Sequence, residues 1–116
     1  MTRFFSSLYF FAFALTLAGC HSEEATREEI LIQTPIGSSM EKVMEFCEMR
    51  KYNCKRSNSA GYLNQRTDAV VGVKSIWAGI DEKRIWLVTL TMSAHWGFDK
   101  DGRLLDIWIW RTIDAI

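Results

Sequence analysis

The C-terminal part of the chain alternates between apolar and polar positions in two long runs that flank a polar turn. Between residues 84 and 113 these runs are rich in Ile, Val, Thr and Trp, residue types that favour β-strands. The turn, residues 99–102, reads Asp-Lys-Asp-Gly, in which Asp tolerates turn geometry and Gly adopts a positive φ without steric cost. The pattern predicts an antiparallel β-hairpin.

Pairing Asp99 with Gly102 would sort the side chains of this hairpin onto two faces. The apolar face would hold the pairs Trp96–Leu105, Ala94–Ile107, Met92–Ile109 and Val88–Ile113. The other face would hold His95–Asp106, Ser93–Trp108, Thr91–Trp110 and Thr89–Thr112. A preceding strand at residues 70–79 would join through a tight turn at Glu82 and Lys83, with Trp77 opposite Val88. We therefore expect a three-stranded meander with one apolar side that another layer must cover.

An amphipathic helix is the expected cover for this sheet. Residues 34–37, Thr-Pro-Ile-Gly, break the chain, and Ser38 with Glu41 three positions later forms a capping-box pattern. One helix face follows, made of Met40, Val43, Met44 and Cys47. The helix should end near Lys51, with an edge strand at residues 55–57. The expected fold class is α+β in two layers, one main helix packed on an antiparallel meander of three to four strands.

The N-terminus carries the pattern of a secretory signal. Arg3 is its only charge, and residues 4–17 are apolar but too few for a comfortable membrane span. Residues 17–20, Leu-Ala-Gly-Cys, resemble the bacterial lipobox, which implies that residues 1–19 are removed and that Cys20 is lipidated. The alternatives are a retained anchor helix or ordinary cleavage. His21, rather than Asp, at the next position implies the outer membrane, facing the periplasm, by resemblance to enterobacterial lipoproteins.

The rest of the chain has the size of a single domain with a nearly neutral charge. Residues 21–29 are polar, so we expect residues 20–33 to be the lipidated cysteine and a solvated tether, with residues 30–32 as a short strand or first contact. Residues 34–116 would then form one α+β domain. Fourteen basic and fourteen acidic side chains balance in the whole chain, which does not favour nucleic acid binding.

The three cysteines point to a disulfide. If Cys20 carries lipid, Cys47 and Cys54 remain as an even pair, which in an oxidising envelope predicts a bond between them. A redox-active pair is the functional alternative to a structural disulfide, but the spacing is not Cys-x-x-Cys. With only His21 and His95 as further soft ligands, no metal site is expected, and no motif calls for a cofactor.

Candidate functional residues lie on the outer face of the predicted sheet. His95 and Asp106 could orient a base, but no nucleophile with an oxyanion hole is evident, so we expect no enzyme activity. Trp108 and Trp110, near Lys74 and Ile76, would be exposed aromatics unless a loop, the N-terminal segment or a second subunit covers them. The polar loop at residues 58–68 is either a solvated connection or a partner contact through Tyr62.

Two motifs carry a resemblance to a known family. A helix opening at residues 37–43, Gly-Ser-Ser-Met-Glu-Lys-Val, and the turn Phe-Asp-Lys-Asp-Gly-Arg-Leu resemble the small outer-membrane lipoproteins of the BamE (SmpA, OmlA) type. The resemblance implies a helix-on-sheet fold and a role in envelope assembly. The leading hypothesis is a non-enzymatic, lipid-anchored module that binds an envelope protein, in one variant an immunity or inhibitor lipoprotein. A homodimer and a small hydrolase using His95 and Asp106 are the alternatives.

Overall fold

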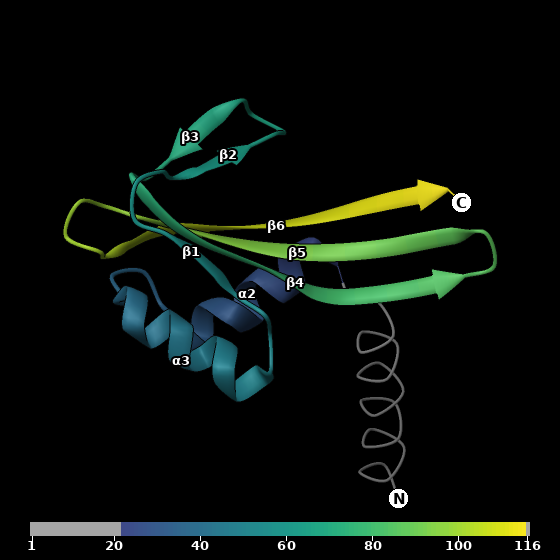
Figure 1. Cartoon of the computed structure of the whole chain (residues 1–116), viewed down its shortest axis with the longest axis horizontal. Helices are drawn as coiled ribbons and strands as arrows, with labels where there is room; N and C mark the ends of the chain where they lie inside the picture. Colours follow the sequence, from purple (N-terminus) through teal and green to yellow (C-terminus); the bar gives the residue numbers. More distant parts are fainter. Residues whose placement is uncertain (1–21, 116) are drawn as a thin grey trace, which may run out of the picture.

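The computed structural model describes residues 22–115, which form two helices and six strands (Figure 1). The helices are α2 (Glu23–Gln33) and α3 (Met40–Arg50), and the strands are β1 (Lys55–Ser57), β2 (Tyr62–Asn64), β3 (Ala69–Val71), β4 (Lys74–Ile85), β5 (Val88–Phe98) and β6 (Leu104–Ala115). Strands β1, β4, β5 and β6 form one antiparallel sheet in the order β1-β4-β5-β6, while β2 and β3 form a separate hairpin. The predicted α+β class is confirmed.

The core lies between the sheet and the two helices. Its largest fully buried side chains are Trp96, Phe98, Ile76, Leu104, Ile107 and Val43. Phe46 of α3 contacts the Trp96 ring edge-on at 6.3 Å between centroids. The indole nitrogen of Trp96 donates to the hydroxyl of Thr34 at 3.2 Å, and that hydroxyl donates to the carbonyl of Ile30 at 2.9 Å. This chain of hydrogen bonds satisfies two polar groups that burial would otherwise penalise.

Helix α3 presents the predicted face to the sheet. Met40, Val43 and Cys47 are buried, and Phe46 joins them. The N-cap is Ser39, one residue later than expected, because its hydroxyl accepts a hydrogen bond from the backbone of Lys42 at 3.1 Å. The helix ends at Lys51, which adopts a left-handed conformation.

The predicted disulfide between Cys47 and Cys54 is present in the structure, with the two Cα atoms 6.1 Å apart. It joins the last turn of α3 to the residue just before β1, where Lys55 begins the predicted edge strand. The bond thus fixes the exit of the chain from the helix layer into the sheet. The cysteine pair has a structural role in this arrangement.

The expectation of a solvated tether at residues 20–33 is wrong for the part that the structure describes. Residues 23–33 form α2, capped by the Ser22 hydroxyl, which accepts from the backbone of Ala25 at 3.0 Å. The helix contacts β6, and Ile30 belongs to the hydrophobic core. The polar residues of this segment are therefore the solvent side of an amphipathic helix. Cys20 and the predicted signal peptide lie outside the described residues.

The β5–β6 hairpin is paired two residues away from the predicted register. Asp99 pairs with Arg103 instead of Gly102: the Asp99 amide donates to the Arg103 carbonyl at 2.9 Å, and Gly102 has φ +75°. Such a three-residue loop shifts the pairing by one residue. A β-bulge at Gly97 and Phe98 shifts it by one more. Because the total is two, the side chains beyond the bulge stay on their predicted faces. Leu105, predicted on the apolar face opposite Trp96, lies at the bulge and is 47% exposed, while Leu104 is buried. His95 lies opposite Trp108, and Asp106 lies opposite Gly97.

The predicted strand at residues 70–79 is divided in two. Gly72, with φ +78°, separates β3 from β4, and β4 continues through Glu82 and Lys83 to a turn at Trp86 and Leu87. Trp77 therefore lies opposite His95 on the outer face and is 44% exposed, whereas Ile76 is buried in the core. The predicted pairing of Trp77 with Val88 is wrong. The charged residues Glu82 and Lys83 do not form a turn, because they belong to a solvent-exposed part of β4.

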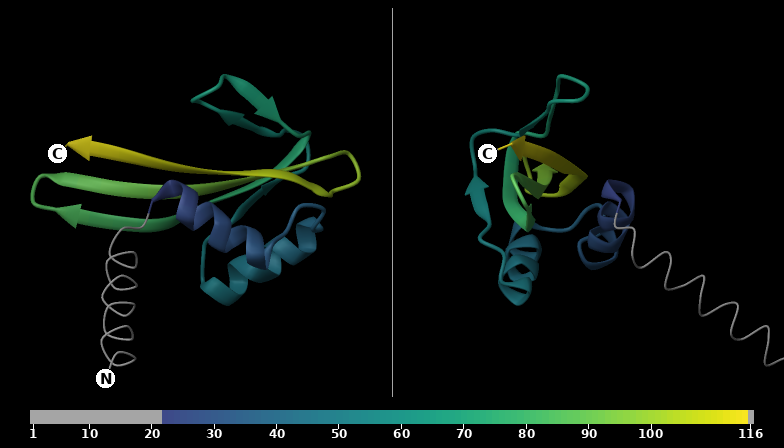
Figure 2. Two further views of the ribbon diagram at one scale, coloured as in Figure 1. Left: turned by 180° about the vertical axis from the view of Figure 1, so that it is seen from behind. Right: turned by 90° about the vertical axis from the view of Figure 1, so that its right-hand side faces the viewer.

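Beyond the helices, β4, β5 and β6 continue as a three-stranded arm, which Figure 2 shows in profile. Met92, Ile107 and Ile109 are buried as predicted, but Val88 and Leu90 are only half-buried because they lie on the arm. The tip, Ile85, Trp86 and Leu87, is exposed. Among residues 22–115 there is no helix long and apolar enough to cross a membrane.

Candidate aromatic binding site

Four aromatic rings gather on the face of the sheet opposite the helices. We call Tyr62, His95, Trp108 and Trp110 the outer aromatic cluster. Ring centroids are 5.1 Å apart for His95 and Trp108 and 5.1 Å apart for Trp108 and Trp110, which are stacked at 18°. Tyr62, from β2, lies 5.8 Å from His95 and 6.2 Å from Trp108. The β2–β3 hairpin thus folds back over the sheet and partly covers this face.

Tyr62 fits over the sheet because residue 97 is glycine. A Cβ atom at Gly97 would come within 2.9 Å of the Tyr62 ring and of Val71. Tyr62 is 5% exposed, so the idea that it contacts a partner directly is wrong. Its hydroxyl has no hydrogen-bond partner among the described residues. Burial, and then the negative charge of Asp106, raises the pKa of the Tyr62 hydroxyl far above its ordinary value, and the charge of Arg27 partly offsets this rise.

The two tryptophans of the cluster differ in their surroundings. Trp108 is 8% exposed under Tyr62, so of the two alternatives for this side chain the structure supports the one in which a loop covers it. Trp110 is half-buried and stacks on Trp108 at the edge of the cluster. Only Trp110 therefore presents an indole surface to a partner, and Trp108 is the rigid support behind it.

His95 and Asp106 do not form the predicted pair. Asp106 binds Arg27 of α2, with Nη2 to Oδ1 at 2.5 Å, and its Oδ1 also accepts from the backbone of Ile107. His95 instead has its Nε2 3.2 Å from the hydroxyl of Ser93. That hydroxyl also donates to the Trp110 carbonyl at 3.4 Å, an arrangement in which Nε2 is the donor and not a base. Burial lowers the pKa of His95, which favours its neutral form.

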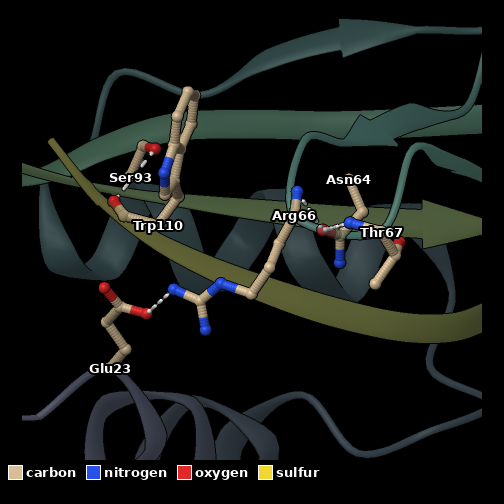
Figure 3. Close-up of polar contacts among 6 residues, drawn as sticks. All are labelled: Glu23, Asn64, Arg66, Thr67, Ser93 and Trp110. Carbon is tan, nitrogen blue, oxygen red and sulfur yellow. Dashed lines mark hydrogen bonds and ion pairs between the residues drawn. The ribbon is translucent and has the colours of Figure 1, made fainter.

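A cleft of about 660 Å³ runs beside this cluster, between the start of α2, strand β6 and the loop of the β2–β3 hairpin. Its charged lining comprises Glu23, Glu24, Arg27, Arg66, Asp106 and Arg111. Arg66 crosses the cleft to bind Glu23 at 3.0 Å, as Figure 3 shows. The side-chain oxygen of Asn64 accepts from the backbone amides of Arg66 and Thr67 and so shapes the loop that carries Arg66. The guanidinium groups of Arg27 and Arg66 are therefore held in place, the first by Asp106 and the second by Glu23 and by the hydrogen-bonded loop that carries it.

Lys74 does not belong to the outer aromatic cluster. It lies opposite Phe98, whose side chain points into the core. Lys74 is therefore at the start of β4 on the face that the helices cover. Trp77, expected on the apolar face opposite Val88, lies instead on the outer face opposite His95, where the Lys55 ammonium lies 5.2 Å from its ring. Residues 22–115 contain no group of three or more His, Cys, Asp or Glu side chains that could hold a metal ion.

Comparison of the chain with protein-family models, curated proteins and solved structures found no match. The likeness to the BamE type is carried by the two short motifs alone. Of these, the turn motif is a regular hairpin loop here, and the helix-opening motif includes the N-cap Ser39. Both therefore have local structural roles in this chain.

Proposed function

We propose that the protein is a lipid-anchored, non-enzymatic protein-binding module of the bacterial cell envelope. The anchor is Cys20, supported by the lipobox that ends an apolar segment. The Cys47–Cys54 disulfide suits an oxidising compartment. The location is the outer membrane, facing the periplasm, supported by the residue that follows Cys20.

The observation that carries this proposal is the stacking of half-buried Trp110 on buried Trp108 beside a cleft lined by both arginine and acidic side chains. Protein interfaces are enriched in tryptophan and arginine, and their strongest anchors are held rigid before binding. Trp110 is held by Trp108 on one side and by the strand it belongs to, and Arg66 is held by Glu23. The partner that fits is a protein with an apolar pocket for the indole and carboxylate groups for the guanidinium groups.

Two roles follow from this chemistry. An immunity or inhibitor lipoprotein would insert Trp110 into an envelope-targeting toxin or hydrolase, and an assembly lipoprotein of the BamE type would use the same surface within a membrane-protein complex. The identity of the captured protein separates them. A hydrolase using His95 and Asp106 is not favoured, because Asp106 binds Arg27 and the His95 ring packs against Trp108.

The test is photo-crosslinking in intact cells. A photoreactive amino acid placed at Arg111, next to Trp110, should crosslink to one discrete protein, while the same probe at Ile32, an exposed position on α2, should not. A crosslinked dimer of the chain itself would indicate the homodimer. Equal, diffuse crosslinking from both positions would contradict the proposal.

A matched pair of variants gives a second measurement. Trp110→Ala should abolish the discrete crosslink from a probe at Arg111, whereas Trp77→Ala, which removes an exposed indole at the far side of the same face, should leave it unchanged. His95→Gln separates the enzyme alternative, because a binder keeps its partner and an enzyme loses turnover.

A further inference from the structure

The arm tip exposes an aromatic residue in an unfavourable backbone conformation. Trp86 is 85% exposed and has φ +53°, in the left-handed region that Gly, Asn and Asp adopt more readily. Its neighbours Ile85 and Leu87 are 52% and 48% exposed. Within residues 22–115 nothing packs on the tip to offset this strain or this exposure. Such outliers commonly mark functional positions.

The apolar surface continues from the tip along one face of the arm. Ile85 pairs with Val88, and Leu90 pairs with Ile113, which is 68% exposed. These four side chains share the face that the helices cover further back along the sheet. Lys83 and Arg84 immediately precede the tip in β4. The end of the arm thus combines an exposed indole, aliphatic side chains and two cations.

The position of the anchor places this tip near a membrane. Only His21 separates Cys20 from Ser22, so the start of α2 lies within about 7 Å of the lipidated residue at full extension. Ser22 lines the same cleft as Arg111, which pairs with Met92. From Met92 the arm extends five residues to Leu87, about 17 Å at the rise of an antiparallel strand. Figure 2 shows the arm continuing past the start of α2.

We propose that the arm tip, Ile85 to Leu87, is a second contact of the protein with the bilayer that holds its lipid. Tryptophan prefers the membrane interface, where its ring is apolar and its nitrogen is hydrated. Lys83, which pairs with Leu90 on the apolar face of the arm, supplies a cation for the anionic headgroups of that surface, and Arg84 supplies a second from the other face. The short link to Cys20 and the tip together define two points of attachment, which fix the tilt of the domain over the membrane. This proposal depends on the lipid anchor of the proposed function.

The experiment uses the mature acylated protein in vesicles of phosphatidylethanolamine and phosphatidylglycerol with brominated acyl chains. Bromine quenches tryptophan emission only at close range. We expect quenching in the native protein, loss of most of it in Trp86→Phe, and no change in Trp77→Phe, which removes another exposed indole. Trp86→Asn should also lose the quenching while keeping the melting temperature, because Asn accepts the left-handed conformation.

Flotation of the vesicles separates the two proposals. If the native protein does not float with vesicles, the lipid anchor itself is wrong. If it floats but its emission is unquenched, or if Trp86→Phe is quenched as strongly as the native protein, the tip does not touch the bilayer and this inference is overturned.

Discussion

Arg27 of α2 binds strand β6 at two adjacent points, with Nη2 on the Asp106 carboxylate at 2.5 Å and Nε on the Ile107 carbonyl at 2.8 Å. This contact joins the helix nearest the proposed anchor to the edge of the sheet. Helix α2 contacts β6. Because the guanidinium geometry is fixed, one side chain sets both the position and the orientation of the helix.

Removing this contact should loosen α2 without unfolding the domain. Both side chains of the ion pair are more than a third exposed, so solvent screens the pair, and we expect Arg27→Ala to cost about 1 kcal/mol. Hydrogen exchange of the α2 amides should rise while that of β5 stays unchanged. Arg50→Ala, which removes an exposed ion pair with Glu29, is the control and should have a smaller effect. Unchanged exchange in α2 would contradict the role of Arg27.

The buried face of β6 supplies a large share of stability. Ile107 is 1% exposed and Leu105, two residues earlier, is 47% exposed. Cutting Ile107 to Ala should cost about 2–5 kcal/mol, because it removes buried methyl groups and leaves a cavity. Leu105→Ala should cost about 0.5 kcal/mol or less. Denaturant unfolding measures both, and equal costs would contradict the difference in burial between the two positions.

The Cys47–Cys54 disulfide should stabilise the domain by restricting the unfolded chain. Seven residues separate the two cysteines, and a loop this short gives about 2–3 kcal/mol in the chain-entropy model. The double variant Cys47→Ala with Cys54→Ala should lose about that amount in denaturant unfolding. Non-reducing peptide mapping of the native protein should find the two residues linked. Free alkylation of both thiols would show that the bond does not form.

The faces of the hairpin were predictable from sequence, although its register was not. Side chains alternate with a period of two, so an error of two residues keeps Ile107 inside and Trp108 outside. The three-residue loop and the Gly97 bulge carry no strong sequence signal before the structure is known. The error in register affected the candidate site, because the predicted contact between His95 and Asp106 required the predicted register.

Burial of the site could not be read from local pattern. Tyr62 lies in a polar loop without periodicity, and its burial comes from stacking on Trp108, which is distant in the sequence. Likewise, Trp86 is an uncommon turn residue, whereas the charged residues Glu82 and Lys83 have the composition of a turn. The mostly polar sequence of residues 23–33 does not indicate a packed helix, because Ile30 is the single deeply buried side chain of α2. A Ser22 cap followed by acidic residues was the signal that could have revealed it.

Stability should fall in mild acid because of His95. Burial lowers its pKa below the ordinary value of 6.5, so the unfolded chain takes up the proton first as the pH falls. The contribution of His95 is therefore complete above about pH 6.5 and is lost progressively below it, as the pH falls toward and through the lower folded pKa. His95→Gln should flatten this part of the stability curve in denaturant unfolding between neutral and mildly acidic pH. A slope that survives in the variant would assign the effect to another group.

Within the outer aromatic cluster, Trp108 and Trp110 have different roles: Trp108 supports its neighbours, and Trp110 is the proposed contact with the partner. Trp108 is buried between Tyr62 and Trp110, so Trp108→Ala should cost about 3–5 kcal/mol and expose the cluster. Trp110 is half-buried, so Trp110→Ala should cost much less stability while removing the indole that we propose as the anchor. Tyr62→Phe deletes a buried hydroxyl that has no partner among residues 22–115, and should leave stability unchanged or raise it by about 1 kcal/mol.

These three variants together test whether Trp108 holds Trp110 in the position from which it binds the partner. Thermal unfolding gives the order of stability, with Tyr62→Phe highest and Trp108→Ala lowest, and crosslinking to the partner gives the order of binding. Because Trp108 only supports Trp110, its loss should weaken binding through disorder of the neighbouring ring, whereas Trp110→Ala should weaken binding in a domain that remains folded. If Trp110→Ala unfolds the domain as severely as Trp108→Ala, both rings are core residues. The partner surface must then lie elsewhere on the protein.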